Sequence, residues 1–292
     1  MKKIFLTSLI PAFLLVFSMS NAQQIPASIP EIYITNGSGE KIGNHPDNKP
    51  LQVELRFRES NPANGDIRTA LVMVTSETEP MGETVELSET AINSGIFRGA
   101  LNVQQSAMPF PTNKKLEVKQ GDRIAAVYTL STKKGSVNDN VMDECWYKGP
   151  DWKFTNTGMS HIVLIPNFAQ ITIDGEKIQP GDFISVFYEK KNGDKVSLEN
   201  AGGMGMNVAP GGIKYTGDMN AIAIWGTQEG KNNGLAAGES MKWKIWRAKD
   251  GKTFDAVATY MSGEVDPTIT DKDKYAIDGI SGILTLTAKS GN

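Results

Sequence analysis

Cysteine is nearly absent from this sequence of 292 residues, which contains one, Cys145. A single cysteine cannot form an intramolecular disulfide, so stability must come from buried apolar area. We interpret Cys145 as a small, half-buried hydrophobic residue, because no histidine or second cysteine stands near it in the sequence to activate the thiol. Histidine is also scarce, with only His45 and His161. A zinc site built from several histidines is therefore excluded.

Long apolar runs are missing after the first residues, so no later segment is predicted to span a membrane. The beginning differs, because residues 1–22 place two lysines before an apolar run and end in a small residue, Ala22. This order is typical of a secretory signal peptide. The sequence therefore predicts an exported protein whose mature chain begins near Gln23 and lies in the extracellular space, on the cell surface or in the periplasm.

A large excess of positive charge is missing as well. Cleavage after Ala22 removes two lysines and leaves 28 of the 30 basic residues against 33 acidic ones. Such a mildly acidic chain gives no reason to expect nucleic acid or an anionic membrane as a partner. The mature chain is long enough for two domains of ordinary size.

Helical periodicity is hardly present, whereas alternation with a period of two recurs along the chain. Apolar and polar residues alternate in 51–57, and the pattern returns at 241–246. Turn clusters rich in glycine and asparagine separate such runs, for example at 36–44 and 190–194. Short strands joined by these turns predict an all-β fold with two Ig-like antiparallel β-sandwich domains after the signal peptide.

A loop-rich stretch at 147–161 separates two series of predicted strands. We expect a first sandwich at 23–150, a linker at 151–166 and a second sandwich at 167–292. Because each series contains its own apolar residues, each half can form its own core.

Two stretches, 119–135 and 179–194, repeat one pattern: Gly-Asp, an apolar strand that ends in tyrosine, and a lysine-rich turn. Glycine allows the backbone conformation of the turn, and the following aspartate can accept hydrogen bonds from turn amides. Asp122 and Asp182 are the only side chains suited to acid chemistry that the two stretches have in common. The repeat therefore predicts a shared architecture rather than a shared acid site.

The string ETVELSETAINSGIFRGAL occupies 83–101, and GDRIAAVY follows at 121–128. With these strings, residues 59–130 resemble a repeated β-sandwich module of large bacterial exported and surface proteins.

The second half carries AQITIDGEKIQPGDFISVFYE at 169–189, NAIAIWGT at 220–227 and DGISGILTLTA at 278–288. With these, residues 168–288 resemble a different module that is common in secreted multidomain proteins of the Bacteroidetes. Both modules are usually non-catalytic parts of their proteins, which is what the resemblance implies for this chain.

The search for catalytic motifs is mostly negative. The sequence has no HExxH and no GxSxG, and its glycine-rich stretch at 201–212 fits neither a P-loop nor a dinucleotide fingerprint. Paired carboxylates for glycoside hydrolysis stay open, because their spacing is spatial, and Glu189, Glu199 and Glu229 are candidates. We predict that the protein is not an enzyme and keep a glycoside hydrolase as the last alternative.

Four tryptophans are candidates for ligand binding. Trp243 and Trp246 fall on opposite faces of one predicted strand, so we expect at least one in a core while the other can be exposed. Trp146 and Trp152 flank the linker, where two domains could clasp a ligand or simply pack together. Exposed aromatic residues on a β-sandwich can stack on sugar rings, which gives a carbohydrate-binding alternative.

An acidic stretch at 264–279 offers hard oxygen ligands that suit calcium. It lacks the spacing of an EF-hand, and Lys272 and Lys274 dilute its charge, so a solvated loop is the competing interpretation. Calcium is the one cofactor that the sequence leaves open, and its candidate ligands are Glu264, Asp266, Asp271, Asp273 and Asp278.

Together these observations predict a non-catalytic exported protein of the cell surface or extracellular space that acts in structure, adhesion or protein interaction. Surface proteins or an extracellular polysaccharide are the expected partners. The main alternative is a carbohydrate-binding protein that uses exposed aromatic residues.

Overall fold

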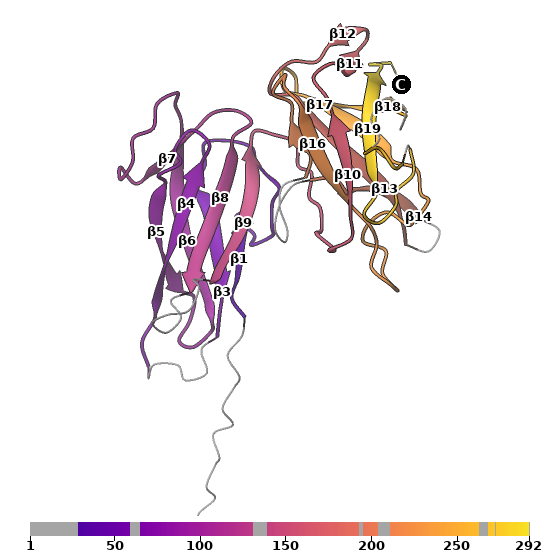
Figure 1. Cartoon of the computed structure of the whole chain (residues 1–292). Helices are drawn as coiled ribbons and strands as arrows, with labels where there is room; N and C mark the ends of the chain where they lie inside the picture. The colour runs from indigo at the N-terminus through magenta and orange to yellow at the C-terminus, as the bar shows by residue number, and fades with distance from the viewer. Residues whose placement is uncertain are drawn as a thin grey trace, which may run out of the picture.

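The computed structural model describes residues 29–58, 65–130, 139–192, 195–203, 211–262, 268–271 and 273–291. Within these ranges the chain forms nineteen strands in two sheets and no helix, which confirms the predicted all-β sandwich fold (Figure 1). It follows that no helix in this part of the chain could cross a membrane. The predicted signal peptide lies outside the described residues.

The first sandwich is a nine-stranded sheet in the order β1-β3-β6-β5-β4-β8-β9-β2, with β7 paired to β6. All of its pairs are antiparallel except β2–β9 and β6–β7. Its strands are β1 (Glu31–Thr35), β2 (Asn44–His45), β3 (Leu51–Arg56), β4 (Thr69–Ser76), β5 (Glu83–Glu89), β6 (Ile96–Gln105), β7 (Lys115–Val118), β8 (Arg123–Leu130) and β9 (Asp139–Tyr147).

The second sandwich is a ten-stranded sheet in the order β12-β11-β19-β18-β17-β13-β14. Off this path β10 pairs with β16 and β19, and β15 pairs with β13. Its strands are β10 (Ser160–Ile165), β11 (Gln170–Ile173), β12 (Glu176–Lys177), β13 (Phe183–Asn192), β14 (Lys195–Asn200), β15 (Ile213–Lys214), β16 (Asn220–Trp225), β17 (Lys242–Arg247), β18 (Lys252–Tyr260) and β19 (Ile280–Ala288).

Each sandwich has its own hydrophobic core. Alternation in β3 buries Leu51, Val53 and Leu55 in the first core, all of whose buried members lie between residues 32 and 147. The buried members of the second core lie between 163 and 288. No strand pair of the described residues joins β1–β9 to β10–β19, so neither half borrows a strand from the other there.

Cys145 lies in the first core. The sequence predicted a half-buried side chain, whereas the structure shows that it is fully buried. Burial raises the pKa of its thiol well above the ordinary value, because the thiolate would lose its solvation. The thiol is therefore an unreactive packing group in the folded protein.

The repeated Gly-Asp pattern is confirmed as architecture. The carboxylate of Asp122 accepts hydrogen bonds from the backbone N–H groups of Thr78 and Lys119 at 3.2 and 2.9 Å. The carboxylate of Asp182 accepts one from the N–H of Gln179 at 2.9 Å. In each turn the preceding glycine has positive φ, which explains why glycine precedes the aspartate.

Candidate functional site

The two sandwiches meet at a cluster of aromatic side chains. Trp146 at the end of β9 and Trp152 in the linker pack against Phe183 and Phe187 of β13 and Trp246 of β17. The ring centroids of Trp146 and Phe183 lie 4.7 Å apart, those of Phe183 and Trp246 5.5 Å, and those of Trp152 and Phe187 5.4 Å, all in edge-to-face contact. Aromatic pairs prefer this geometry because the positive ring edge meets the negative ring face.

Polar contacts also join the two sandwiches beside this aromatic cluster, which we call the junction. The side-chain amide of Gln120 donates a hydrogen bond to the backbone carbonyl of Ala248 at 3.0 Å. The ammonium group of Lys214 in the second sandwich forms an ion pair with Glu77 in the first. The junction therefore fixes the sandwiches against each other through both apolar and polar contacts.

The four tryptophans named as ligand candidates are all buried. Trp243 lies in the second core and donates a hydrogen bond from Nε1 to the hydroxyl of Tyr260 at 2.7 Å. Trp246 occupies the opposite face of β17, as the alternation predicted, but the junction covers it. The expectation that one of these side chains can be exposed is thus wrong for this pair, and the four do not form an exposed strip for sugar rings.

The predicted calcium ligands do not come together where the structure describes them. Asp271 accepts a hydrogen bond from the hydroxyl of Thr270 at 2.6 Å, and Asp273 forms an ion pair with Lys274 at 3.6 Å. Asp278 has positive φ in the turn before β19. Glu264 and Asp266 lie outside the described residues. Within the described ranges, no group of three or more His, Cys, Asp or Glu side chains has an arrangement that could hold a metal ion.

Two of the three carboxylates considered for glycoside hydrolysis, Glu189 and Glu199, do not face each other, and the third, Glu229, is exposed in the turn after β16. Glu189 of β13 pairs with Leu198 of β14 in the sheet register, whereas Glu199 pairs with Tyr188, so the two glutamates lie on opposite faces of the sheet. Glu189 forms an ion pair with Lys242 and Glu199 forms one with a lysine of β13. Their carboxylates thus have separate structural partners.

A serine–histidine contact exists that sequence reasoning missed. The Nε2 atom of His161 lies 2.8 Å from the hydroxyl oxygen of Ser281, and Nδ1 contacts the backbone of Ala276. Both side chains are fully buried, and burial lowers the pKa of His161. A catalytic nucleophile must be reachable by its substrate. The pair is therefore a buried packing contact, and its separation of 120 residues gave no motif that could have revealed it.

A groove of about 410 Å³ lies beside the beginning of β17 and the second half of β18 in the second sandwich. Trp243, Ala256 and Tyr260 contribute to its lining, and Lys244 and Asp255 form an ion pair at its rim. The groove combines apolar surface with a few polar groups, which is the usual character of a small-molecule site.

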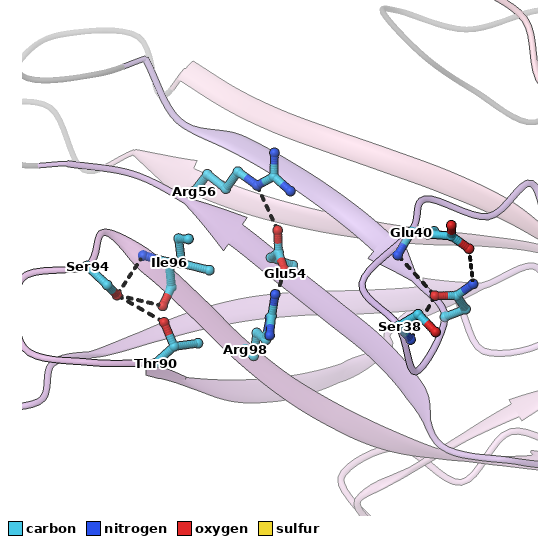
Figure 2. Close-up of polar contacts among 9 residues, drawn as sticks. Ser38, Glu40, Glu54, Arg56, Thr90, Ser94, Ile96 and Arg98 are labelled. Carbon is cyan, nitrogen blue, oxygen red and sulfur yellow. Dashed lines mark hydrogen bonds and ion pairs between the residues drawn. The ribbon is translucent and has the colours of Figure 1, made fainter.

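Buried carboxylates in the first sandwich are usually paired with cations. Figure 2 shows Glu54 between Arg56 and Arg98, each of which donates a hydrogen bond to it at 2.7 Å. Glu89 accepts two hydrogen bonds from Arg68 at 2.9 and 2.7 Å, and this arginine holds the pKa of Glu89 at about 2. A buried charge must be compensated in this way, because it has lost its hydration.

Three other buried glutamates of the first sandwich lie close to one another and form no ion pair with a described cation. Glu79, Glu83 and Glu117 lie together beside the loop 106–114, and all three are buried. Burial, together with the negative charges of Glu117 and Glu83, raises the pKa of Glu79 to about 7. This cluster of like charges is the chemically unusual feature of the first sandwich.

Comparison with known proteins adds little to this description. No protein-family model matches the chain, and no curated protein matches it. Among solved structures, a DUF4785 family protein from Legionella pneumophila is similar at 9% sequence identity and a TM-score of 0.24, over 73% of this chain and 53% of that one. The chain thus spans about half the length of that protein. A likeness of this size supports no statement about function.

Proposed function

We propose that the protein is a non-catalytic, exported component of the cell surface or extracellular space that acts in structure, adhesion or protein interaction. The junction between the sandwiches carries this proposal. Three tryptophans and two phenylalanines lie buried where the halves meet, and they join two domains with separate cores into one unit. A joined pair of sandwiches presents binding surfaces at a fixed spacing, which is what a scaffold or an adhesin requires.

The chemistry of the described side chains supports the same proposal. The candidate hydrolytic glutamates Glu189 and Glu199 lie on opposite faces of their sheet, and the serine–histidine pair has no access to solvent. None of these contacts offers an activated nucleophile beside an open cavity.

Cell fractionation and N-terminal sequencing in the native host test where the protein acts. We expect a mature form that begins near Gln23 and is cleaved by protease added outside the cells or released by osmotic shock. A strain that lacks the protein should lose attachment to other cells or to surfaces, and the wild-type chain should restore it. An intact Met1 form in the cytosol, or turnover of glycosides by the purified protein, would contradict the proposal.

Carbohydrate recognition is the second candidate, and the groove beside β17 and β18 is the observation that favours it. Its test is a glycan-binding screen with the mature chain and with Ala256→Leu, which places a larger side chain in the lining of the groove. Val196→Ala, a change at an exposed residue of the neighbouring strand β14, is the matched control. Binding that Ala256→Leu abolishes and Val196→Ala preserves would favour this candidate over protein interaction.

A further inference from the structure

The glutamates beside the loop 106–114 come from three segments of the first sandwich. Glu79 lies in the turn between β4 and β5, Glu83 begins β5, and Glu117 lies in β7. The side chain of Glu79 is 0% exposed. Side chains from separate parts of the sequence therefore converge in one water-excluded place.

The hydrogen-bond donors around these carboxylates are all neutral. Glu117 accepts hydrogen bonds from the backbone N–H of Phe110 at 2.8 Å and from the side-chain amide of Asn113 at 3.0 Å. Glu83 accepts one from the backbone N–H of Asn113 at 2.8 Å. No ion pair of the described residues involves any of the three glutamates.

Among these glutamates, Glu79 has a carboxylate oxygen without a hydrogen-bond partner. Its Oε2 atom accepts a hydrogen bond from the backbone N–H of Glu117 at 2.9 Å. Its Oε1 atom is buried and has no hydrogen-bond partner in the structure. The negative charge of Glu117 also helps to raise the pKa of Glu79, because two ionised carboxylates in this place repel each other.

Other buried carboxylates of the first sandwich have a cationic partner, which Glu79 and Glu117 do not have among the described ion pairs. Besides Glu54 and Glu89, the buried Asp143 pairs with Lys41, and the buried Glu144 lies 3.3 Å from Arg123. Positive charge thus accompanies each of these carboxylates. At Glu79 and Glu117 no ion pair of the described residues supplies such a charge, and a buried, uncompensated carboxylate is strongly destabilising, so either a bound cation or a shared proton has to compensate it.

We propose that a divalent metal cation of the calcium class binds between the carboxylates of Glu79 and Glu117. Hard cations of this kind prefer carboxylate oxygens, and calcium completes its shell with backbone oxygens and water. The proposed site uses two carboxylates, so it does not depend on three acidic side chains in an arrangement that could hold a metal ion, which the described residues do not offer. Glu83 adds negative charge nearby without having to be a ligand.

The position of the site gives it a consequence for binding. Glu117 and Glu83 hold the loop 106–114 through Phe110 and Asn113, and this loop exposes Met108 and Phe110 by 72% and 69%. A cation on Glu117 fixes the carboxylate to which the loop is anchored. Calcium therefore orders an exposed apolar loop.

Thermal melting of the mature chain 23–292 tests the proposal directly. A pH of about 8 lies above the raised pKa of Glu79, which is about 7, and about 10 mM CaCl₂ exceeds the dissociation constants typical of extracellular calcium modules. We expect the melting temperature of the first sandwich to rise by about 5 °C relative to EDTA. Glu79→Gln should abolish this rise. The matched control, Glu86→Gln, changes an exposed glutamate of the following strand β5 and should keep the rise.

Three outcomes would overturn the proposal. The first is no rise in the wild-type protein together with no heat of calcium binding in titration calorimetry, which needs no variant. The second is a rise that Glu79→Gln retains. The third is the result expected if Glu79 and Glu117 share a proton instead of a cation. In that case calcium has no effect on the melting temperature. The melting temperature then falls as the pH rises from about 5 to about 8 in the wild type, but not in Glu79→Gln.

Discussion

Replacing Trp146 by alanine should uncouple the two sandwiches. Its indole ring packs 4.7 Å from the ring of Phe183, and its Nε1 atom donates a hydrogen bond to the carbonyl of Gly211 at 3.2 Å. Removing a buried tryptophan costs roughly 3–5 kcal/mol, and an edge-to-face pair contributes about 1 kcal/mol of that amount. Most of this loss belongs to the junction, because Trp146 belongs to the aromatic cluster there and to neither sandwich core.

Urea unfolding followed by circular dichroism measures this effect. We expect one transition in the wild type and two in Trp146→Ala, because each sandwich keeps its own core but no longer stabilises the other. Val257→Ala is the control, since this side chain of β18 is 72% exposed and its loss should change stability by about 0.5 kcal/mol or less. A Trp146→Ala protein that unfolds in one unshifted transition would refute the reasoning.

Four further predictions concern buried polar and titratable groups. Arg68→Ala leaves Glu89 buried without its cation and should cost about 3–5 kcal/mol in urea unfolding, whereas Arg68→Lys should cost less. Because the folded pKa of Glu89 is about 2 and its ordinary value is 4.5, its contribution to stability should be present above pH 4.5 and lost as the pH falls toward 2 in acid titration. His161 has a lowered pKa, so unfolding takes up a proton and stability should decline as the pH falls below its ordinary value of 6.5; His161→Gln should flatten that part of the profile. Cys145 should react with a thiol reagent only after unfolding, reductant should leave the melting temperature unchanged, and rapid labelling of the native protein would contradict its burial.

Local patterns in the sequence were sufficient to predict some of the strands and turns. The alternation at 51–57 predicted the buried face of β3, and the Gly-Asp pairs predicted the turns closed by Asp122 and Asp182. These features depend on neighbouring residues alone. The period of two and the conformational freedom of glycine are therefore visible in a single sequence.

Contacts between distant residues could not be predicted in the same way. Alternation placed Trp246 on the face opposite the second core, yet what covers that face includes Trp146, one hundred residues earlier in the chain. The meeting of Glu79 and Glu117 likewise depends on β7 lying parallel to the end of β6, and no spacing rule connects the two glutamates. The calcium ligands expected at 264–279 were predicted from the acidic composition of that stretch. Composition does not determine where side chains point.

The place of β19 in the second sandwich determines the order in which the two halves can fold. This strand pairs with β10, β11 and β18, and it is the last of the nineteen strands in chain order. During synthesis the first sandwich has all its strands once β9 has emerged, whereas the second lacks its central strand until residue 288 is made. Its sheet must be closed by contacts that join residues more than one hundred positions apart, which makes folding slow. The second half therefore cannot complete its sheet until the chain has been made to residue 288, whereas the first half has no such dependence on it.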